Sequence, residues 1–269
     1  MPTLQDKVNY WTALNATQNQ SFIDQNLNSM FLYNGSEGNL ARVRTYKLSC
    51  HQLAALLNIN GSTPNNQLRV HLAGNPAIPY GQTTSAPSFS IILDAYHLPA
   101  NAAHRTFNSL EPNSIEMEAV LGPDVILGES PSVLPEGAIS MGDANIMDEA
   151  YKNNFPALGA PSNFTAAFIS VNSEHPNKLV NGFVVGSEGV DDIVHHLRNG
   201  DGASLYIHLG YLPSTYSLPN HDWFRFRSVL QINGGAAAGN KTFYYDFAKP
   251  CPPACGGGFV EAPLENTIN

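Results

Sequence analysis

The sequence predicts an α+β protein, with mixed α/β elements, organised as a tandem duplication of one strand-helix-strand-strand unit. Three observations support this prediction. The chain resembles itself at one constant offset, which places Leu68 on Leu205. Both copies carry strand and helix periodicities in the same order. The 269 residues, of which 43% are hydrophobic, also suffice for two medium-sized cores.

The self-similarity is strongest around one short apolar segment. The offset places Leu68–Leu72 on Leu205–Leu209 and, without a gap, Phe89 on Phe226. Six identities fall between residues 66 and 95, and the apolar positions coincide over a longer span. The alternative is that two ordinary amphipathic segments have fallen into phase. We interpret the match as a duplication.

Each copy has the same expected elements. Ser49 and Gln52 have the spacing of a capping box before a helix, and Ser187 and Gly200 bracket the equivalent helix. Alternating apolar residues predict strands at 42–48, 68–72 and 89–95 in the first copy, at 180–185, 205–209 and 226–232 in the second, and additionally at 30–33 and 167–171. We expect the sheet of each copy to be mixed.

Each copy is also expected to begin with a helix. Thr3 and Asp6 form a capping box before the first helix, and Ile146 to Tyr151 have helical spacing in the second copy, where the alignment needs a shift of a few residues. The expected organisation is a first repeat at 1–97, an ordered connector at 98–141 with a strand at 115–120, a second repeat at 142–249 and an irregular tail at 250–269.

Charge and apolar patterning exclude several classes of function. Charged residues make up 13% of the chain, about half the usual ~25%, and the net charge is -9. The 13 basic residues are scattered, which argues against binding to nucleic acid or to an anionic membrane surface. The sequence shows neither a signal peptide nor an apolar stretch of ~20 residues. We therefore expect a cytoplasmic protein.

The C-terminal tail holds two of the three cysteines. Cys251 and Cys255 have three residues between them, a spacing that suits one half of a zinc site, a regulatory disulfide or a turn with two inert thiols. The partners for a full zinc site are missing, so we predict no metal and no cofactor. This Cys-Pro-Pro-Ala-Cys ending resembles that of uncharacterised bacterial proteins that finish in Cys-Pro-Pro-x-Cys. The resemblance implies no particular activity.

Candidate site residues come from the repeat and from one aromatic loop. His71 and His208 are equivalent and face away from the Leu, Val and Ile side chains of their strands. If the copies pack about a pseudo-twofold axis, the imidazoles can converge as a metal site or an acid–base pair; otherwise they are hydrogen-bonded structural residues. The exposed aromatic residues expected to bind a ligand, unless they close the core, are Tyr211, Tyr216, Trp223 and Phe224.

These patterns favour a structural role over catalysis. We found no catalytic or nucleotide-binding motif, which weakens the hypothesis of an enzyme without removing it. A duplicated unit and a weakly charged exterior favour a self-assembling protein that forms a homo-oligomer or filament, with itself as its partner. The alternatives are a module that binds a small-molecule ligand or a protein in the cleft between the repeats, and an enzyme of unknown reaction that uses His71 and His208.

Overall fold

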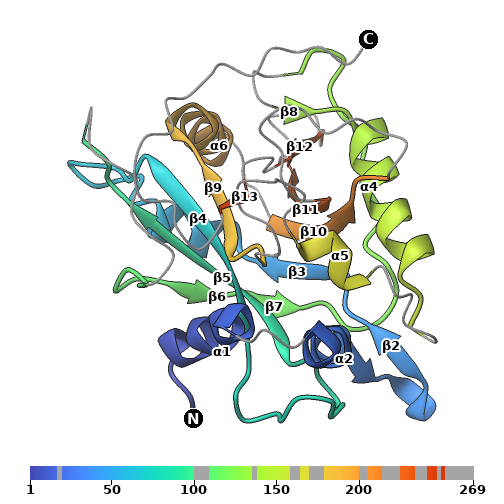
Figure 1. Cartoon of the computed structure of the whole chain (residues 1–269). Helices are drawn as coiled ribbons and strands as arrows, with labels where there is room; N and C mark the ends of the chain where they lie inside the picture. Colours follow the sequence, from blue (N-terminus) through green and yellow to red (C-terminus); the bar gives the residue numbers. More distant parts are fainter. Residues whose placement is uncertain are drawn as a thin grey trace.

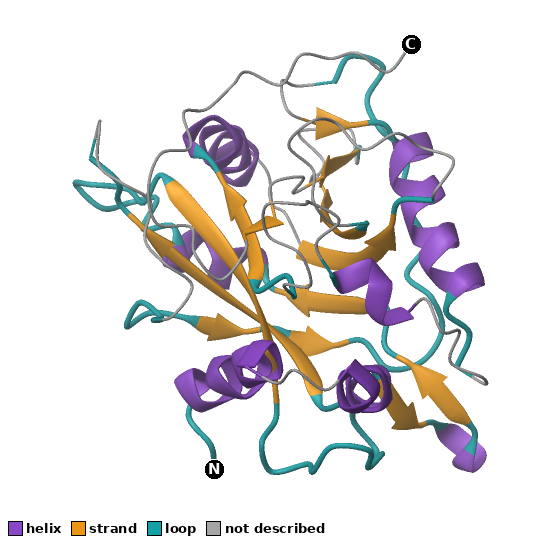
Figure 2. Cartoon of the chain, viewed as in Figure 1, coloured by secondary structure: helices purple, strands orange, loops and turns teal. Residues whose placement is uncertain are grey.

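We analysed a computed structural model of the chain. It describes residues 1–16, 20–99, 109–134, 138–157, 164–169, 179–199, 205–213, 225–233, 241–246 and 250–251. The described part combines helices with antiparallel sheets, which confirms the predicted α+β class (Figure 2). None of the helices in these ranges is both long enough and apolar enough to cross a membrane.

Two large sheets form the body of the protein. The β10 sheet has the order β7 (Glu118–Ala119), β3 (Thr45–Leu48), β10 (Leu205–Tyr211), β11 (Phe226–Asn233), β12 (Thr242–Asp246) and β8 (Ala138–Ile139). The β4 sheet has the order β13 (Pro250–Cys251), β9 (Gly182–Val185), β4 (Gln67–Gly74), β5 (Phe89–Tyr96) and β6 (Ile115–Glu116). A separate hairpin joins β1 (Leu32–Asn34) to β2 (Leu40–Arg42).

The two halves of the chain exchange a strand. In the β10 sheet, β3 of the first half pairs with β10 of the second, and Leu48 lies opposite Leu205. In the β4 sheet, β9 of the second half pairs with β4 of the first, and Val185 lies opposite Leu68. The two registers coincide under the offset found in the sequence, as do those of the β4–β5 and β10–β11 pairs. The halves are therefore joined in common sheets.

The exchange explains why the expected mixed sheets are wrong. Every strand pair in the described ranges is antiparallel. A strand, a helix and a second strand would place both strands in parallel if they were neighbours in one sheet. Here the first strand of each unit pairs with the other half instead. The matching registers are what a duplication would leave, and the duplication itself remains a prediction.

Helices lie on the outer faces of the sheets and also contribute side chains to the core between them (Figure 1). The long ones are α1 (Leu4–Ala16), α2 (Gln20–Met30), α4 (Met141–Asn154) and α6 (Ser187–Asn199), and the short ones are α3 (Cys50–Leu56), α5 (Phe164–Phe168) and the 3-10 turn η1 (Ser36–Gly38). In the two halves α1 packs on β4 and α4 packs on β10. Their first residues, Leu4 and Met141, coincide under the same offset as Leu68 and Leu205, but the buried Val8 falls on the exposed Asn145, so the expected shift in the alignment stays a prediction.

The common core lies between the two sheets and is rich in aromatic side chains. Phe89 from β5 stacks on Phe31 with their ring centroids 4.0 Å apart, and Phe226 from β11 stacks on Phe168 at 4.1 Å. The indole Nε1 of Trp11 donates a hydrogen bond to the backbone oxygen of Val180 at 2.8 Å. The first helix is thus bound to the second half of the chain.

The structure confirms both predicted capping boxes. The Ser49 hydroxyl accepts from the backbone of Gln52, whose side-chain oxygen accepts from the backbone of Ser49. Thr3 and Asp6 form the same reciprocal pair before α1. These bonds satisfy backbone donors that the first turn of a helix leaves free.

Several predicted strands differ from the structure. The strand expected at 42–48 is divided, because the backbone at Val43 bonds to Phe31 near the hairpin before β3 joins the other sheet. The segment expected as a strand at 115–120 forms β6 and β7, which pair with different sheets. The strand expected at 30–33 begins later, as β1. The strand expected at 167–171 is wrong over its first residues, which belong to α5 and to a single bridge at Ile169.

Candidate functional site

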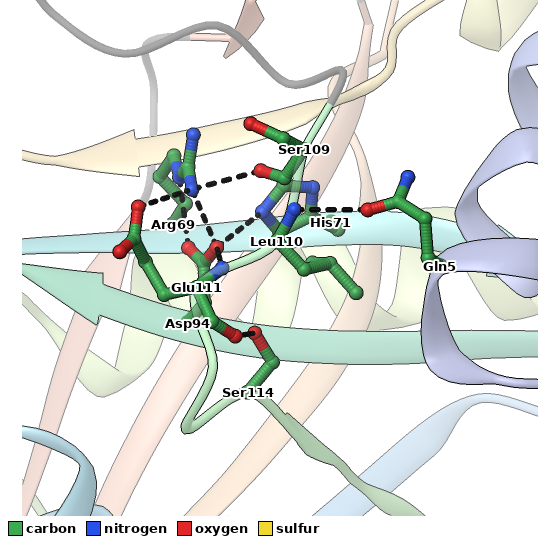
Figure 3. Close-up of polar contacts among 8 residues, drawn as sticks. All are labelled: Gln5, Arg69, His71, Asp94, Ser109, Leu110, Glu111 and Ser114. Atoms are coloured by element: carbon green, nitrogen blue, oxygen red, sulfur yellow. Dashed lines mark hydrogen bonds and ion pairs between the residues drawn. The ribbon is translucent and has the colours of Figure 1, made fainter.

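Two polar clusters lie at equivalent places on the outer faces of the two sheets. The first, which we call the Arg69 cluster, consists of Arg69, His71, Asp94 and Glu111 (Figure 3). Arg69 and His71 alternate along β4 with apolar residues that enter the core, so both face outwards. Asp94 lies directly opposite Arg69 on β5. Strand register therefore brings these three side chains together.

The centre of the Arg69 cluster is a buried ion pair. Arg69 donates two hydrogen bonds to Asp94, from Nε to Oδ1 at 2.8 Å and from Nη2 to Oδ2 at 2.5 Å. Nε2 of His71 lies 3.2 Å from the same Oδ2, and the three side chains have 0% exposure. The Arg69 guanidinium also lies 5.0 Å from the centre of the Tyr96 ring. Such a buried charge persists only where it is paired and hydrogen-bonded.

The cluster is hydrogen-bonded to residues 109–111, the segment that covers it. Nη2 of Arg69 donates to the backbone oxygen of Ser109 at 3.1 Å and lies 3.6 Å from Oε1 of Glu111. The backbone N–H of Glu111 donates to the buried carboxylate at 3.1 Å. The next bond leads to α1, where Oε1 of Gln5 accepts from the backbone of Leu110 at 3.0 Å. Access from solvent to the ion pair therefore requires that this segment or α1 move.

Burial and pairing set the protonation states in this cluster. Burial lowers the pKa of His71, partly offset by its hydrogen bond to Asp94 and by the charge of that carboxylate. For Asp94, burial alone raises the pKa, but hydrogen bonds from His71 and Arg69 outweigh it and bring the pKa below its usual value. At neutral pH the cluster therefore holds a neutral imidazole beside a carboxylate and a guanidinium.

The second cluster, the His208 cluster, consists of Thr45, His208, Gln231 and Asn233 in the β10 sheet. An amide, Gln231, stands where the first cluster has the carboxylate of Asp94. Nε2 of His208 lies 2.6 Å from Oε1 of Gln231, and Nδ1 lies 3.2 Å from the hydroxyl of Thr45. These distances fit a neutral ring that donates from Nε2 and accepts at Nδ1. Burial lowers the pKa of His208 to about 4.

The structure does not bring His71 and His208 together. Each lies on the face of its sheet opposite the Leu, Val and Ile side chains that meet in the common core. A shared metal site or acid–base pair between the two rings is therefore not formed. No group of three His, Cys, Asp or Glu side chains in the described ranges is arranged to hold a metal ion.

A third polar group lies between α6 and β12. The hydroxyl of Tyr245 donates to Oδ2 of Asp192, whose Oδ1 lies 3.6 Å from Nε2 of His196. The His196 ring stacks on Phe243 with centroids 3.7 Å apart, and burial lowers its pKa despite the nearby carboxylate. Burial, followed by the bond to Asp192, raises the pKa of Tyr245. The first half has Ala55 and Ile59 at the positions of the Asp and His.

The other predicted site residues fall in the core or outside the described ranges. Tyr211 is buried in the core, with its ring edge-on to Phe155 at 5.0 Å, so the expectation of an exposed aromatic is wrong there. Tyr216, Trp223, Phe224 and Cys255 lie outside the described residues. The backbone of Cys251 pairs with Gly182 of β9, and its side chain is not described.

An apolar surface lies on the connector and on α4. We define it by the exposed side chains of Ile126, Val133, Leu134, Met141 and Ile146. The connector is held against α4, because the backbone of Met141 donates to the Ser130 hydroxyl at 2.7 Å and Leu127 packs against the small apolar cluster that contains Ala144 and Met147. Of the seven large hydrophobic residues exposed in the described ranges, six fall between residues 121 and 146. Exposed apolar side chains are therefore concentrated in one region.

Comparisons with known proteins provide no relative. No family model, no curated protein and no solved structure matches the chain. The resemblance of the C-terminal tail to uncharacterised bacterial proteins therefore stays a prediction.

Sequence reasoning found both histidines but not their partners. Arg69 and Asp94 belong to different strands, and only the register of β4 against β5 places them opposite each other. Glu111 comes from a connector whose path no periodicity predicts. The available signal was an Arg and an Asp within two otherwise apolar strands, because such residues are buried only when they are paired.

Proposed function

We propose that this protein is a self-assembling structural protein whose copies associate into a homo-oligomer or a filament. The observation that carries the proposal is the apolar surface, where Ile126 is 88% exposed and Val133 is 81% exposed. Residues 126–146 hold five of the seven exposed large apolar side chains of the described ranges, and a surface that another protein covers would account for this concentration. A cytoplasmic location, expected from the sequence, belongs to the same proposal.

A second copy of the chain is the partner that best fits this surface. The chain has few charges near the surface to specify a foreign partner, since only 13% of its residues are charged. A self-complementary contact would close into a dimer, whereas contact between this surface and a different face would propagate as a filament. Ligand binding between the repeats and catalysis remain predictions.

The test is sedimentation equilibrium of the full chain with and without a charged surface. The double variant Val133→Glu, Ile146→Glu should lose the association that the wild type shows through this surface. Ala86→Glu is the matched control, because it adds a carboxylate at an exposed position of another loop and should leave association unchanged. A wild-type chain that is monomeric at every concentration would contradict the proposal.

A further inference from the structure

The interface between the two halves has the form of an interface between subunits. The strand β9 completes the β4 sheet, and β3 completes the β10 sheet, each strand coming from the other half. The edge strands β7 and β13 pair within their own halves, β7 with β3 and β13 with β9, and so extend the exchanged strands in the sheet of the other half. Each half thus presents a strand edge with which the other half pairs in a defined register.

We infer that two copies of this chain can exchange halves. The first half of one copy then pairs with the second half of the other, in place of its own second half. The exchanged form keeps every strand pair of the monomer, because the first half of one copy completes the second half of the other. Two copies that exchange reciprocally give a closed dimer, and copies that exchange in series give a linear assembly. This inference deepens the proposed function and rests on strand pairing instead of on the apolar surface.

The link between the halves is a short, largely exposed segment, residues 121–126, which we call the hinge. On its first side, the backbone of Val120 donates to the oxygen of Thr45 at 2.9 Å. On its second side, the hydroxyl of Tyr244 donates to the backbone oxygen of Gly128 at 2.7 Å. Residues 121–124 and Ile126 are exposed. If the hinge extends so that the halves separate, the backbone changes its path over few residues. The contacts within each half are kept.

The polar contacts of the hinge are weak enough to be broken and made again. Asp124 pairs with Arg44 of the first half and lies 3.4 Å from Nζ of Lys152 in the second half. Both partners of Asp124 are at least 23% exposed, and ion pairs between exposed side chains contribute about 0–1 kcal/mol. Loss of these contacts in an exchanged dimer is therefore a small penalty beside the strand pairs that are retained.

The decisive experiment places a disulfide across the exchanged strand pair. Lys47 on β3 lies opposite Tyr206 on β10, and neither side chain is fully buried. Facing residues of antiparallel strands have Cα atoms about 4.5–5.5 Å apart, within disulfide range. Lys47→Cys and Tyr206→Cys are introduced together into a full chain whose three native cysteines are replaced by Ser. The chain is refolded at low and at high concentration, its monomer and dimer fractions are separated, and both are oxidised.

The expected result is a covalent dimer from the dimer fraction and an internally linked monomer from the monomer fraction on a non-reducing gel. The control pair, Asn233→Cys with Thr242→Cys, joins β11 and β12 within the second half and should give only internal links in both fractions. A dimer fraction with only internal links in the Lys47/Tyr206 variant would overturn the inference, as would the absence of a dimer at every refolding concentration.

A second background separates this inference from the proposed function. When Val133→Glu and Ile146→Glu are added, dimers held by the apolar surface should disappear, whereas exchanged dimers should remain and still give the interchain link. The exchange would be refuted if the cysteine variant without these Glu substitutions gave only internal links and the variant with them gave no dimers. The apolar surface would then be the sole basis for association.

Discussion

The Arg69 cluster and the His208 cluster occupy equivalent positions in the two sheets, but the buried imidazole of each has different polar partners. In the first half, His71 lies beside a carboxylate that is itself neutralised by Arg69. In the second half, His208 is bonded to an amide and a hydroxyl. The same strand register therefore supports either a charged or a neutral cluster.

The stability of the first half therefore depends more on buried charge than that of the second half. Removing one member of a buried ion pair leaves the other charge buried and unpaired. Removing one member of a neutral network leaves only an unsatisfied hydrogen-bond donor or acceptor. The first half should thus be the more sensitive to single substitutions in its cluster. The second half should be the more sensitive to protonation, because its imidazole is bonded to an amide and a hydroxyl, which stabilise an added positive charge less than a carboxylate does.

The largest effect is expected for Asp94→Asn. The substitution leaves the guanidinium of Arg69, at 0% exposure, without its bidentate partner. We expect a loss of about 3–5 kcal/mol in the free energy of unfolding, measured by chemical denaturation at pH 7. Glu111→Gln is the comparison variant, because this side chain is 21% exposed and should cost less. A loss under about 1 kcal/mol for Asp94→Asn would show that Glu111 alone compensates the guanidinium.

Acidification should produce the next largest effect, through His208. Its pKa falls from 6.5 to about 4 on folding, so below pH 6.5 the unfolded chain binds a proton that the folded chain does not. Stability is therefore full above pH 6.5 and is lost as the pH falls towards 4, by about 3 kcal/mol in total. His208→Gln should lose less stability over this window in matched denaturation curves. An identical loss in both proteins would assign the effect to other groups, such as His71.

A smaller loss is expected for Gln231→Leu. This variant removes the acceptor 2.6 Å from Nε2 of His208 and leaves a buried N–H unsatisfied. The cost should be about 1–3 kcal/mol, which is less than that of Asp94→Asn at the equivalent position. Asn233→Ala is the control, because it removes only the outer bond to Gln231. Equal losses for Gln231→Leu and Asp94→Asn would remove the distinction between the clusters.

The smallest effect concerns a helix end. Ser49→Ala removes the hydroxyl that accepts from the backbone of Gln52 at the start of α3 and should cost about 1 kcal/mol. Ser49→Asn should restore most of this stability, since Asn also caps well. If Ala and Asn at position 49 behave alike in thermal unfolding, the capping bond contributes nothing measurable.

Much of the local structure was predictable from the sequence. The helix starts at Thr3 and Ser49 follow from short-range hydrogen bonds, and the strands around Val70 and Ile207 follow from a strict period of two. The helix α2 and the strand β12 were missed. In β12 the residues Phe243 to Tyr245 are uniformly apolar or aromatic, so no alternation distinguishes the strand.

The pairing of strands and the site were harder to predict. A period of two tells which face of a strand is buried but not which strand lies next to it, so the exchange of β3 and β9 could not be foreseen. For the same reason, His71 and His208 were expected to converge, whereas each faces away from the common core. The contact between Arg69 and Asp94 depends on how β4 aligns with β5, which is a property of the folded sheet.

The exchange of strands also has a consequence for the order of events on the ribosome. The strand β4 ends at Gly74, but its neighbour β9 is not complete until Val185 has been synthesised. At about 5–20 residues per second, this edge of β4 waits on the order of ten seconds for its partner. The indole of Trp11 waits longer for the oxygen of Val180, which follows it by 169 residues. An apolar strand edge left open for that time is a site where nascent chains can join.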